Sequence, residues 1–417
     1  MKIKVKNLSY SEVMALPRPS HKKPPRPFLS LKLLVKALSD LSLKGVTLRV
    51  SDEVKSIDKN EPILYLMNHS SFVDLMIASK MIWPRDYHIV CTSDGFVGKE
   101  GLMRRIGCIP TRKFVMDVSL VKDIVYVTKK LRNSVLMYPE ASYSFDGTAT
   151  PLPKELGKLV KMLGVNVVMI KTDGAFLHDP LYNCLQTRKV QLSANASLLF
   201  SKESLREKSL EDVNAELKNA FSFDYFKAQQ ENHVCVNEPF RADGLNRVLY
   251  KCPHCGSEKD MEGKGVSITC KKCGSEYELT EYGFLECKNG QGKFNHIPDW
   301  YSWERQCVKE EIEKGEYSLD IPVDIIMMVD YKAVYRVGDG QLRHDREGFK
   351  LVGCDGQLNY FQSARSSYSL YADYYWYEIA DVICIGNTDC LYYCFPKCDY
   401  DVVAKTRLAA EEIYKMS

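Results

Sequence analysis

The sequence lacks any run of about 18 apolar residues, the length that a membrane-spanning helix needs. Lys161 and Asn166 interrupt the longest candidate, residues 159–170. A secretory signal is also absent, so the 15 cysteines are expected to be thiols or metal ligands in a reducing compartment. These absences favour a cytoplasmic location.

Two common catalytic signatures are missing as well. No Gly-x-Ser-x-Gly elbow occurs, so a serine nucleophile is not expected. Gly290-Gln291-Gly292 lacks both the third glycine and the strand-to-helix setting of a dinucleotide fingerprint. The sequence therefore indicates no dinucleotide coenzyme.

Acidic residues are scarce near the N-terminus. The first 50 residues contain eleven Lys or Arg against Glu12 and Asp40, a net +9, which leaves −6 for the remainder of a chain of net charge +3. Residues 1–38 form a basic Pro-rich arm followed by an amphipathic helix pattern, whose apolar residues are Phe28, Leu31, Leu34, Val35 and Leu38. This segment predicts peripheral binding to anionic membranes. The alternative is a packed helix with a solvated basic face.

The clearest chemical pattern runs from Asn68 to Asp74, between an apolar strand-like run and an apolar helical pattern. It places His69 on the turn, Ser70 or Ser71 at the helix N-cap, and Asp74 about one turn inside the helix. Because helical side chains lean toward the N-terminus, the Asp74 carboxylate can reach the His69 imidazole. The pattern predicts a His/Asp pair in which His69 acts as a general base.

Two further blocks follow at the ends of strand-like segments, Gly107 to Lys113 and Leu136 to Ser144. Together the three blocks resemble glycerolipid acyltransferases of the lysophosphatidic acid acyltransferase type over about residues 40–230. The resemblance implies an α/β domain, a mixed sheet flanked by helices, over residues 39–230. It also implies catalytic His69 and Asp74, and substrate-binding residues: Asn68, Ser71, Arg112, Glu140, Ser142 and Lys171.

The resemblance implies transfer of an acyl group from acyl-CoA or acyl-carrier protein to 1-acyl-glycerol 3-phosphate, giving phosphatidic acid. The third block departs from the family pattern, because Glu140-Ala141-Ser142-Tyr143 stands where Glu-Gly-Thr-Arg is usual. The proline of the usual fourth block is absent around Lys171. Phosphate binding then rests on Arg112, with Lys113 or Lys171 adding charge. Another lysophospholipid or a non-phosphate acceptor stays open, as does a noncatalytic lipid- or nucleic-acid-binding protein.

A second strong pattern is Cys252-x2-Cys255 followed, after fourteen residues, by Cys270-x2-Cys273. Each pair predicts a tight knuckle, and two knuckles complete a tetrahedral thiolate site. Residues 248–285 therefore predict a zinc ribbon with a structural zinc that has no open position for catalysis. Acidic residues offset the lysines of this segment, so nucleic acid is not an expected partner.

The last 98 residues, 320–417, change to an alternating aromatic pattern with turn residues such as Gly338-Asp339-Gly340. Short strands are expected from Asp324 to Phe395, and Val402 to Tyr414 is expected to form a closing helix. This order of elements resembles a pleckstrin-homology or GRAM-like domain. Residues 231–247 are expected to be a linker.

Overall fold

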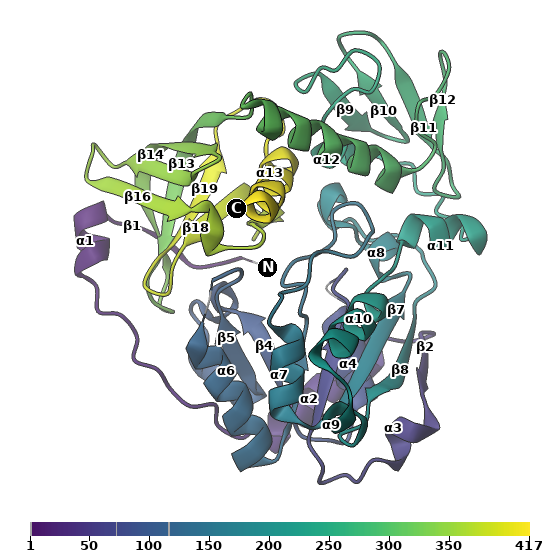
Figure 1. Ribbon diagram of the computed structural model, residues 1–417, viewed down its shortest axis with the longest axis vertical. Helices are drawn as coiled ribbons and strands as arrows, with labels where there is room; N and C mark the ends of the chain where they lie inside the picture. Colours follow the sequence, from purple (N-terminus) through teal and green to yellow (C-terminus); the bar gives the residue numbers. More distant parts are fainter. Residues whose placement is uncertain (1, 72, 116) are drawn as a thin grey trace.

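The computed structural model describes residues 2–71, 73–115 and 117–417, which form three sheets with surrounding helices (Figure 1). The architecture is mixed α/β, as the sequence predicted. No helix in the described part of the chain is long and apolar enough to cross a bilayer.

The N-terminal sheet has seven strands in the order β2-β8-β7-β3-β6-β4-β5. Every neighbouring pair is parallel except β7 and β8, so the sheet is mixed. Its strands are β2 (Thr47–Val50), β3 (Ile63–Met67), β4 (Tyr87–Thr92), β5 (Cys108–Thr111), β6 (Ser134–Met137), β7 (Asn166–Asp173) and β8 (Ser193–Phe200). The central strand β3 is a continuous buried apolar run, as expected for a parallel strand covered on both faces.

Alternate residues of β3 contribute to two separate cores, one on each face of the sheet. One face is covered by α3 (Asp52–Ser56) and α4 (Asp74–Ile82), and α2 (Leu29–Ser42) packs on the outer side of α4. The other is covered by α6 (Val118–Val125) with its π-helical continuation (Tyr126–Leu131), α7 (Leu156–Leu163) and α10 (Leu210–Ala220). The remaining helices of this region are α5 (Glu100–Ile106), α8 (Ala175–His178), α9 (Ser204–Glu207) and α11 (Tyr225–Glu231).

The N-terminal arm reaches the opposite end of the molecule. Strand β1 (Val5–Asn7), followed by α1 (Tyr10–Ala15), pairs in parallel with β14 of the C-terminal sheet (Figure 1). The basic segment then lies against the N-terminal region, where Arg26 donates to the Leu131 carbonyl at 2.7 Å and Lys22 pairs with Glu100 at 3.1 Å. The basic segment contains no acidic residue between Lys22 and Lys36, and the fold supplies an acidic partner from the N-terminal region.

The four cysteines lie in a small antiparallel sheet of order β12-β11-β10-β9. Its strands are β9 (Met261–Lys264), β10 (Ser267–Cys270), β11 (Glu276–Leu279) and β12 (Leu285–Cys287). The segment before it, residues 231–247, was expected to be a linker but is instead packed: Val236, Ala242 and Leu245 are buried in the main core. The segment has no regular helix or strand pattern, but its apolar side chains are buried in the core and so hold it in place.

The C-terminal sheet runs β16-β15-β14-β13-β19-β18-β17 and is antiparallel apart from β1. The long helix α12 (Ile297–Lys314) precedes it and α13 (Val403–Met416) follows it. Its strands are β13 (Leu319–Met328), β14 (Val334–Asp345), β15 (Gly348–Gly353), β16 (Leu358–Ser363), β17 (Tyr371–Trp376), β18 (Ala380–Gly386) and β19 (Leu391–Pro396). The predicted closing helix is therefore present.

Two details of this sheet differ from the sequence prediction. Gly338-Asp339-Gly340 lies inside β14 rather than in a turn, because a side chain at Gly340 would meet Ile325 and the Val352 carbonyl within 2.7 Å. Glycine here permits close strand packing. The strand expected from Tyr375 to Ile379 is only partly present: its first two residues end β17, a turn with positive φ at Tyr377 and Glu378 follows, and β18 begins after that turn.

The C-terminal sheet packs directly on the N-terminal region. Val97 and Phe114 of that region share a core with residues of β13, β17 and β19. Beside it, the buried carboxylate of Asp94 accepts hydrogen bonds from Tyr371 at 2.6 Å and Trp376 at 3.2 Å. This contact places β17 next to the strand ends that carry the three sequence blocks.

Candidate active site

The first block forms a His/Asp pair at the end of β3. His69 Nδ1 lies 3.2 Å from Asp74 Oδ2. The same carboxylate oxygen accepts the backbone N–H groups of Ser70 at 2.8 Å and Ser71 at 3.0 Å. Asp74 thus holds the turn in place. It also favours the imidazole tautomer with the proton on Nδ1, which leaves Nε2 as the nitrogen that can accept a proton.

The helix start differs from the prediction. The N-cap of α4 is Val73 and Asp74 is the first helical residue, not a residue one turn inside. Ser71 Oγ accepts the Val73 N–H at 3.1 Å and donates to Asp179, so it does not cap the helix. The Asp74 carboxylate instead points back and accepts the two N–H groups that precede the helix, those of Ser70 and Ser71.

Two tyrosines enclose the His69 ring. The ring centroids of Tyr138 and Tyr143 each lie 4.2 Å from that of His69, and the His69 side chain keeps 20% of its surface exposed. Burial lowers the pKa of His69, while the hydrogen bond and charge of Asp74 oppose this effect and the Lys113 charge adds to it. The imidazole is therefore held neutral near pH 7, the state that a base requires.

The third block follows β6, the parallel neighbour of β3, so the carboxyl ends of both strands meet at one edge. Glu140 Oε2 accepts the His69 N–H at 3.1 Å and Oε1 accepts the Thr150 N–H at 2.9 Å. Burial raises the pKa of Glu140 to about 7. Ala141 has φ +54°, a conformation that favours glycine and costs about 1–2 kcal/mol with a side chain. Glu140 thus joins the first block to the third.

Comparison with known families agrees with this geometry. The Acyltransferase family model matches residues 48–171, which include all three blocks. The chain contains an acyltransferase domain. Among solved structures it is similar to the 1-acyl-sn-glycerophosphate (LPA) acyltransferase PlsC from Thermotoga maritima, with 13% identity, a TM-score of 0.32, and coverage of 46% of this chain and 78% of that one. No curated protein matches the sequence.

The second block of the acyltransferase domain lies against the C-terminal sheet. Arg112 follows β5, and its Nε atom is buried without a hydrogen-bond partner among the described residues. Burial raises the pKa of Tyr331 in the C-terminal region, and the nearby Arg112 charge opposes that rise. Lys113 Nζ lies 4.3 Å from the Tyr371 ring centroid. Both cations therefore lie between the acyltransferase domain and the C-terminal sheet.

Lys171 and Ser142 occupy different surroundings. Lys171 is in β7, and no contact in the described part of the chain joins it to the other predicted site residues. Ser142 is buried and its Oγ donates to the Tyr143 carbonyl at 3.1 Å. The structure thus brings Ser142 to the His69 neighbourhood through Tyr143, but not Lys171.

Asn68 forms hydrogen bonds with two residues that the sequence did not predict as part of the site, Thr172 and Tyr225. Its side chain donates to Thr172 Oγ1 at 2.9 Å and accepts the Thr172 N–H at 3.0 Å. It also donates to the hydroxyl of Tyr225 on α11, which in turn accepts from Ser70 Oγ at 3.0 Å. Tyr225 lies 157 residues from Asn68, and no local pattern marks a single buried tyrosine of this kind.

The four cysteines form a separate candidate metal centre. Their sulfur atoms all lie within 4.8 Å of one another, with 3.7 Å between Cys252 and Cys273 and between Cys255 and Cys270. A tetrahedral zinc with bonds of about 2.3 Å separates its sulfur ligands by about 3.8 Å. The cluster could therefore hold a metal ion such as zinc. Gly256 and Gly274, both with φ near +75°, allow the two knuckle turns.

Proposed function

We propose that the protein transfers an acyl group from a thioester, acyl-CoA or acyl-carrier protein, to the hydroxyl of 1-acyl-glycerol 3-phosphate. The observation that supports this most directly is the His69–Asp74 pair, 3.2 Å apart, inside the region that the Acyltransferase family model matches. The product would be phosphatidic acid and a free thiol.

In this proposal, His69 removes the proton of the acceptor hydroxyl while the oxygen attacks the thioester carbonyl. The tetrahedral intermediate then collapses, the carbon–sulfur bond breaks, and His69 returns the proton to the leaving thiolate. Asp74 stabilises the imidazolium that exists between these two steps. Arg112 would bind the acceptor phosphate, since a guanidinium matches its oxygen atoms.

A second acceptor class is supported by Tyr143, which occupies the third-block position where an arginine is usual. Tyr143 packs on His69, and burial raises the pKa of Tyr143 with added effects of Asp74 and Asp373. Asp373 belongs to β17, so a carboxylate lies near this ring. These surroundings would suit a head group with less negative charge than a phosphomonoester.

Two further roles belong to the same proposal. The cysteine cluster would bind a structural zinc, because four protein ligands leave no position for a substrate. Helix α2 would contact the membrane that contains the lipid acceptor. It exposes five leucine side chains to solvent: Leu29, Leu33, Leu34, Leu38 and Leu41. Such a row on one helix is typical of a shallow interfacial helix.

One assay tests the reaction. The purified full-length protein is incubated with 1-acyl-glycerol 3-phosphate, lysophosphatidylethanolamine or monoacylglycerol, each with acyl-CoA or acyl-carrier protein, and the products are identified by mass spectrometry. We expect phosphatidic acid from the first acceptor, at a rate that His69→Gln abolishes. Preference for either other acceptor would favour the second class. Lysolipid binding without any His69-dependent product would contradict catalysis.

A further inference from the structure

The C-terminal helix reaches into the acyltransferase domain at one buried arginine. Arg407 of α13 is only 3% exposed. Its Nη1 donates to Ser142 Oγ at 3.3 Å and to the Tyr143 carbonyl at 3.4 Å, and its guanidinium lies 4.4 Å from the Phe145 ring centroid. A single side chain, 264 residues downstream of Tyr143, thus contacts two positions of the third block and the adjacent Phe145.

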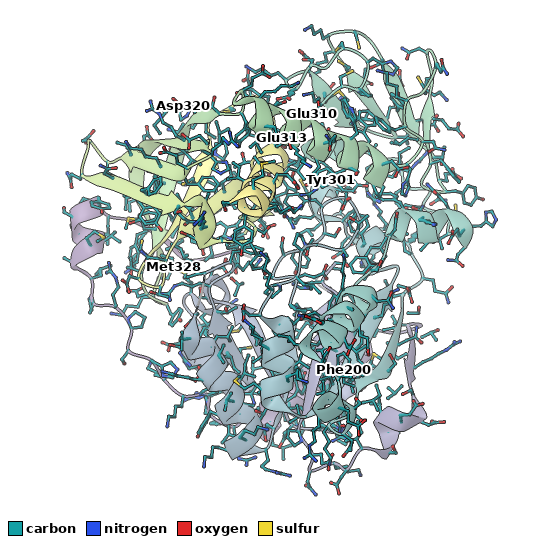
Figure 2. The ribbon with its side chains drawn as sticks, viewed as in Figure 1. Phe200, Tyr301, Glu310, Glu313, Asp320 and Met328 are labelled. Carbon is teal, nitrogen blue, oxygen red and sulfur yellow. The ribbon has the colours of Figure 1, made fainter. Side chains whose placement is uncertain are left out.

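A charge network keeps this guanidinium in place. Arg407 Nε lies 3.3 Å from Glu411 on the next turn of α13. Glu411 is itself held by Arg305 of α12 at 2.7 Å and by Ser369 Oγ at 2.7 Å. The charges of Arg305 and Arg407 hold the pKa of Glu411 below its usual value, although burial opposes them. Helices α12 and α13 lie side by side (Figure 1). The contacts of Arg305 and Arg407 with Glu411 therefore fix the orientation of the Arg407 guanidinium. In Figure 2, Tyr301 of α12 lies in this same region beside α13.

Arg407 is linked to the proposed base, His69, through one residue, Tyr143. Arg407 binds the backbone carbonyl of Tyr143, and the Tyr143 ring packs 4.2 Å from that of His69. Tyr143 shields one side of the imidazole and Tyr138 the other. The groups that face His69 are Asp74 from α4, Lys113 after β5, Glu140 at its backbone N–H, and these two rings. Arg407 touches none of the reacting atoms, so its role is positional.

We propose that Arg407 is a positioning residue of the acyltransferase site, which holds Tyr143 against His69 so that the C-terminal helix completes the environment of the base. This inference rests on the proposed function. It explains how a chain with tyrosine in the third block keeps that block ordered: the guanidinium that fixes the loop comes from the C-terminal helix.

The test is Arg407→Lys, which keeps the positive charge but loses the planar guanidinium that reaches the third block through Nη1 and Glu411 through Nε. We expect kcat to fall roughly ten- to a hundredfold, because small displacements of a catalytic group carry costs of this order, with little change in KM for the acyl donor. A looser Tyr143 admits water to His69, which weakens the effect of burial and raises the pKa of His69. The acidic limb of the pH profile should then move to higher pH.

Histidine NMR titration gives a reading that does not need turnover. The His69 ring signal, assigned with His69→Gln, should titrate at higher pH in Arg407→Lys and in Tyr143→Leu. In the double variant the shift should equal that of Tyr143→Leu alone, because Arg407 acts through Tyr143. Glu411→Gln, which removes the charge that orients Arg407, should shift the signal in the same direction and serves if Arg407→Lys fails to fold.

Lys415→Ala is the matched control, since Lys415 lies on the same helix, is 55% exposed and pairs only with Glu412 at 2.6 Å among the described residues. It should change neither kcat nor the His69 titration. The inference is overturned if Arg407→Lys and Glu411→Gln leave the His69 titration unchanged, or if the effects of Arg407→Lys and Tyr143→Leu simply add. Absence of turnover with any acceptor would refute the proposed function instead, while the NMR titration would still decide the role of Arg407.

Discussion

The cysteine cluster and the His69 site differ in where their residues come from. All four cysteines lie within residues 252–273, and the two Cys-x2-Cys turns repeat one local geometry. The His69 site begins with an equally local pair, His69 and Asp74, but Glu140, Tyr225 and Arg407 complete it from distant parts of the chain. Local spacing is therefore enough to predict the whole cysteine cluster, whereas it predicts only the His/Asp pair of the other site.

The largest expected effect is loss of the metal. We expect about one zinc per chain, held by Cys252, Cys255, Cys270 and Cys273 with a binding free energy on the order of 10 kcal/mol, lost at low pH as the thiolates protonate. Elemental analysis of protein purified without chelator measures this. Cys270→Ser/Cys273→Ser should remove the metal and Cys235→Ser should not. Metal content below about a tenth of stoichiometry, or unchanged in the double variant, would contradict the assignment.

Substitutions of His69 and Asp74 test the pair at the centre of the other site. His69→Ala should reduce turnover by roughly two to four orders of magnitude while the protein stays folded, because it removes the base. Asp74→Asn should reduce it less. Steady-state kinetics on the best acceptor provide the measurement, with circular dichroism as the folding check. Near-full activity in either variant would show that the pair is not the catalytic centre.

A more distant contribution is that of Arg112. If it binds the acceptor phosphate, Arg112→Ala should raise KM for a phosphate-bearing acceptor about ten- to a hundredfold and leave a phosphate-free acceptor unaffected. Lys171→Ala is the matched control, since the structure gives Lys171 no contact with the site among the described residues. Equal effects of Arg112→Ala on both acceptors would exclude a phosphate contact.

The pH profile of the wild-type protein reports the pKa of His69, which depends on both its neighbour Asp74 and its burial by distant residues. His69 must be neutral to act as a base, so activity is lost as pH falls through its pKa. Since burial lowers that pKa, the acidic limb should lie below pH 6.5. Asp74 opposes this lowering, so Asp74→Asn should move the limb to still lower pH. A wild-type limb above pH 6.5 would contradict the buried, neutral imidazole.

The smallest expected effect for each substituted side chain concerns the membrane. Lys32 pairs with Asp86 and Lys36 with Asp40, which reduces the charge that α2 offers to anionic lipid. Binding should then depend mainly on the exposed leucines, and Leu34→Ser/Leu38→Ser/Leu41→Ser should weaken vesicle co-sedimentation by about 1 kcal/mol per side chain. Phe361→Ser, 55% exposed on the C-terminal sheet, is the control. If salt abolishes binding and the leucine variants do not, charge rather than apolar contact attaches the protein.

The sequence by itself determined the parts that depend on neighbours along the chain. The apolar run before Asn68 predicted β3, the spacing of His69 and Asp74 predicted their contact, and the cysteine spacing predicted the cluster. Only the tertiary structure decided the rest. Val73 rather than a serine precedes α4, because Ser71 Oγ donates to Asp179 from a distant part of the chain. The predicted linker, residues 231–247, is packed because its apolar side chains enter a core, and β1 joins a sheet more than 300 residues downstream. Such pairings depend on which surfaces meet in the folded chain, and the same reason places Arg407 beside Tyr143.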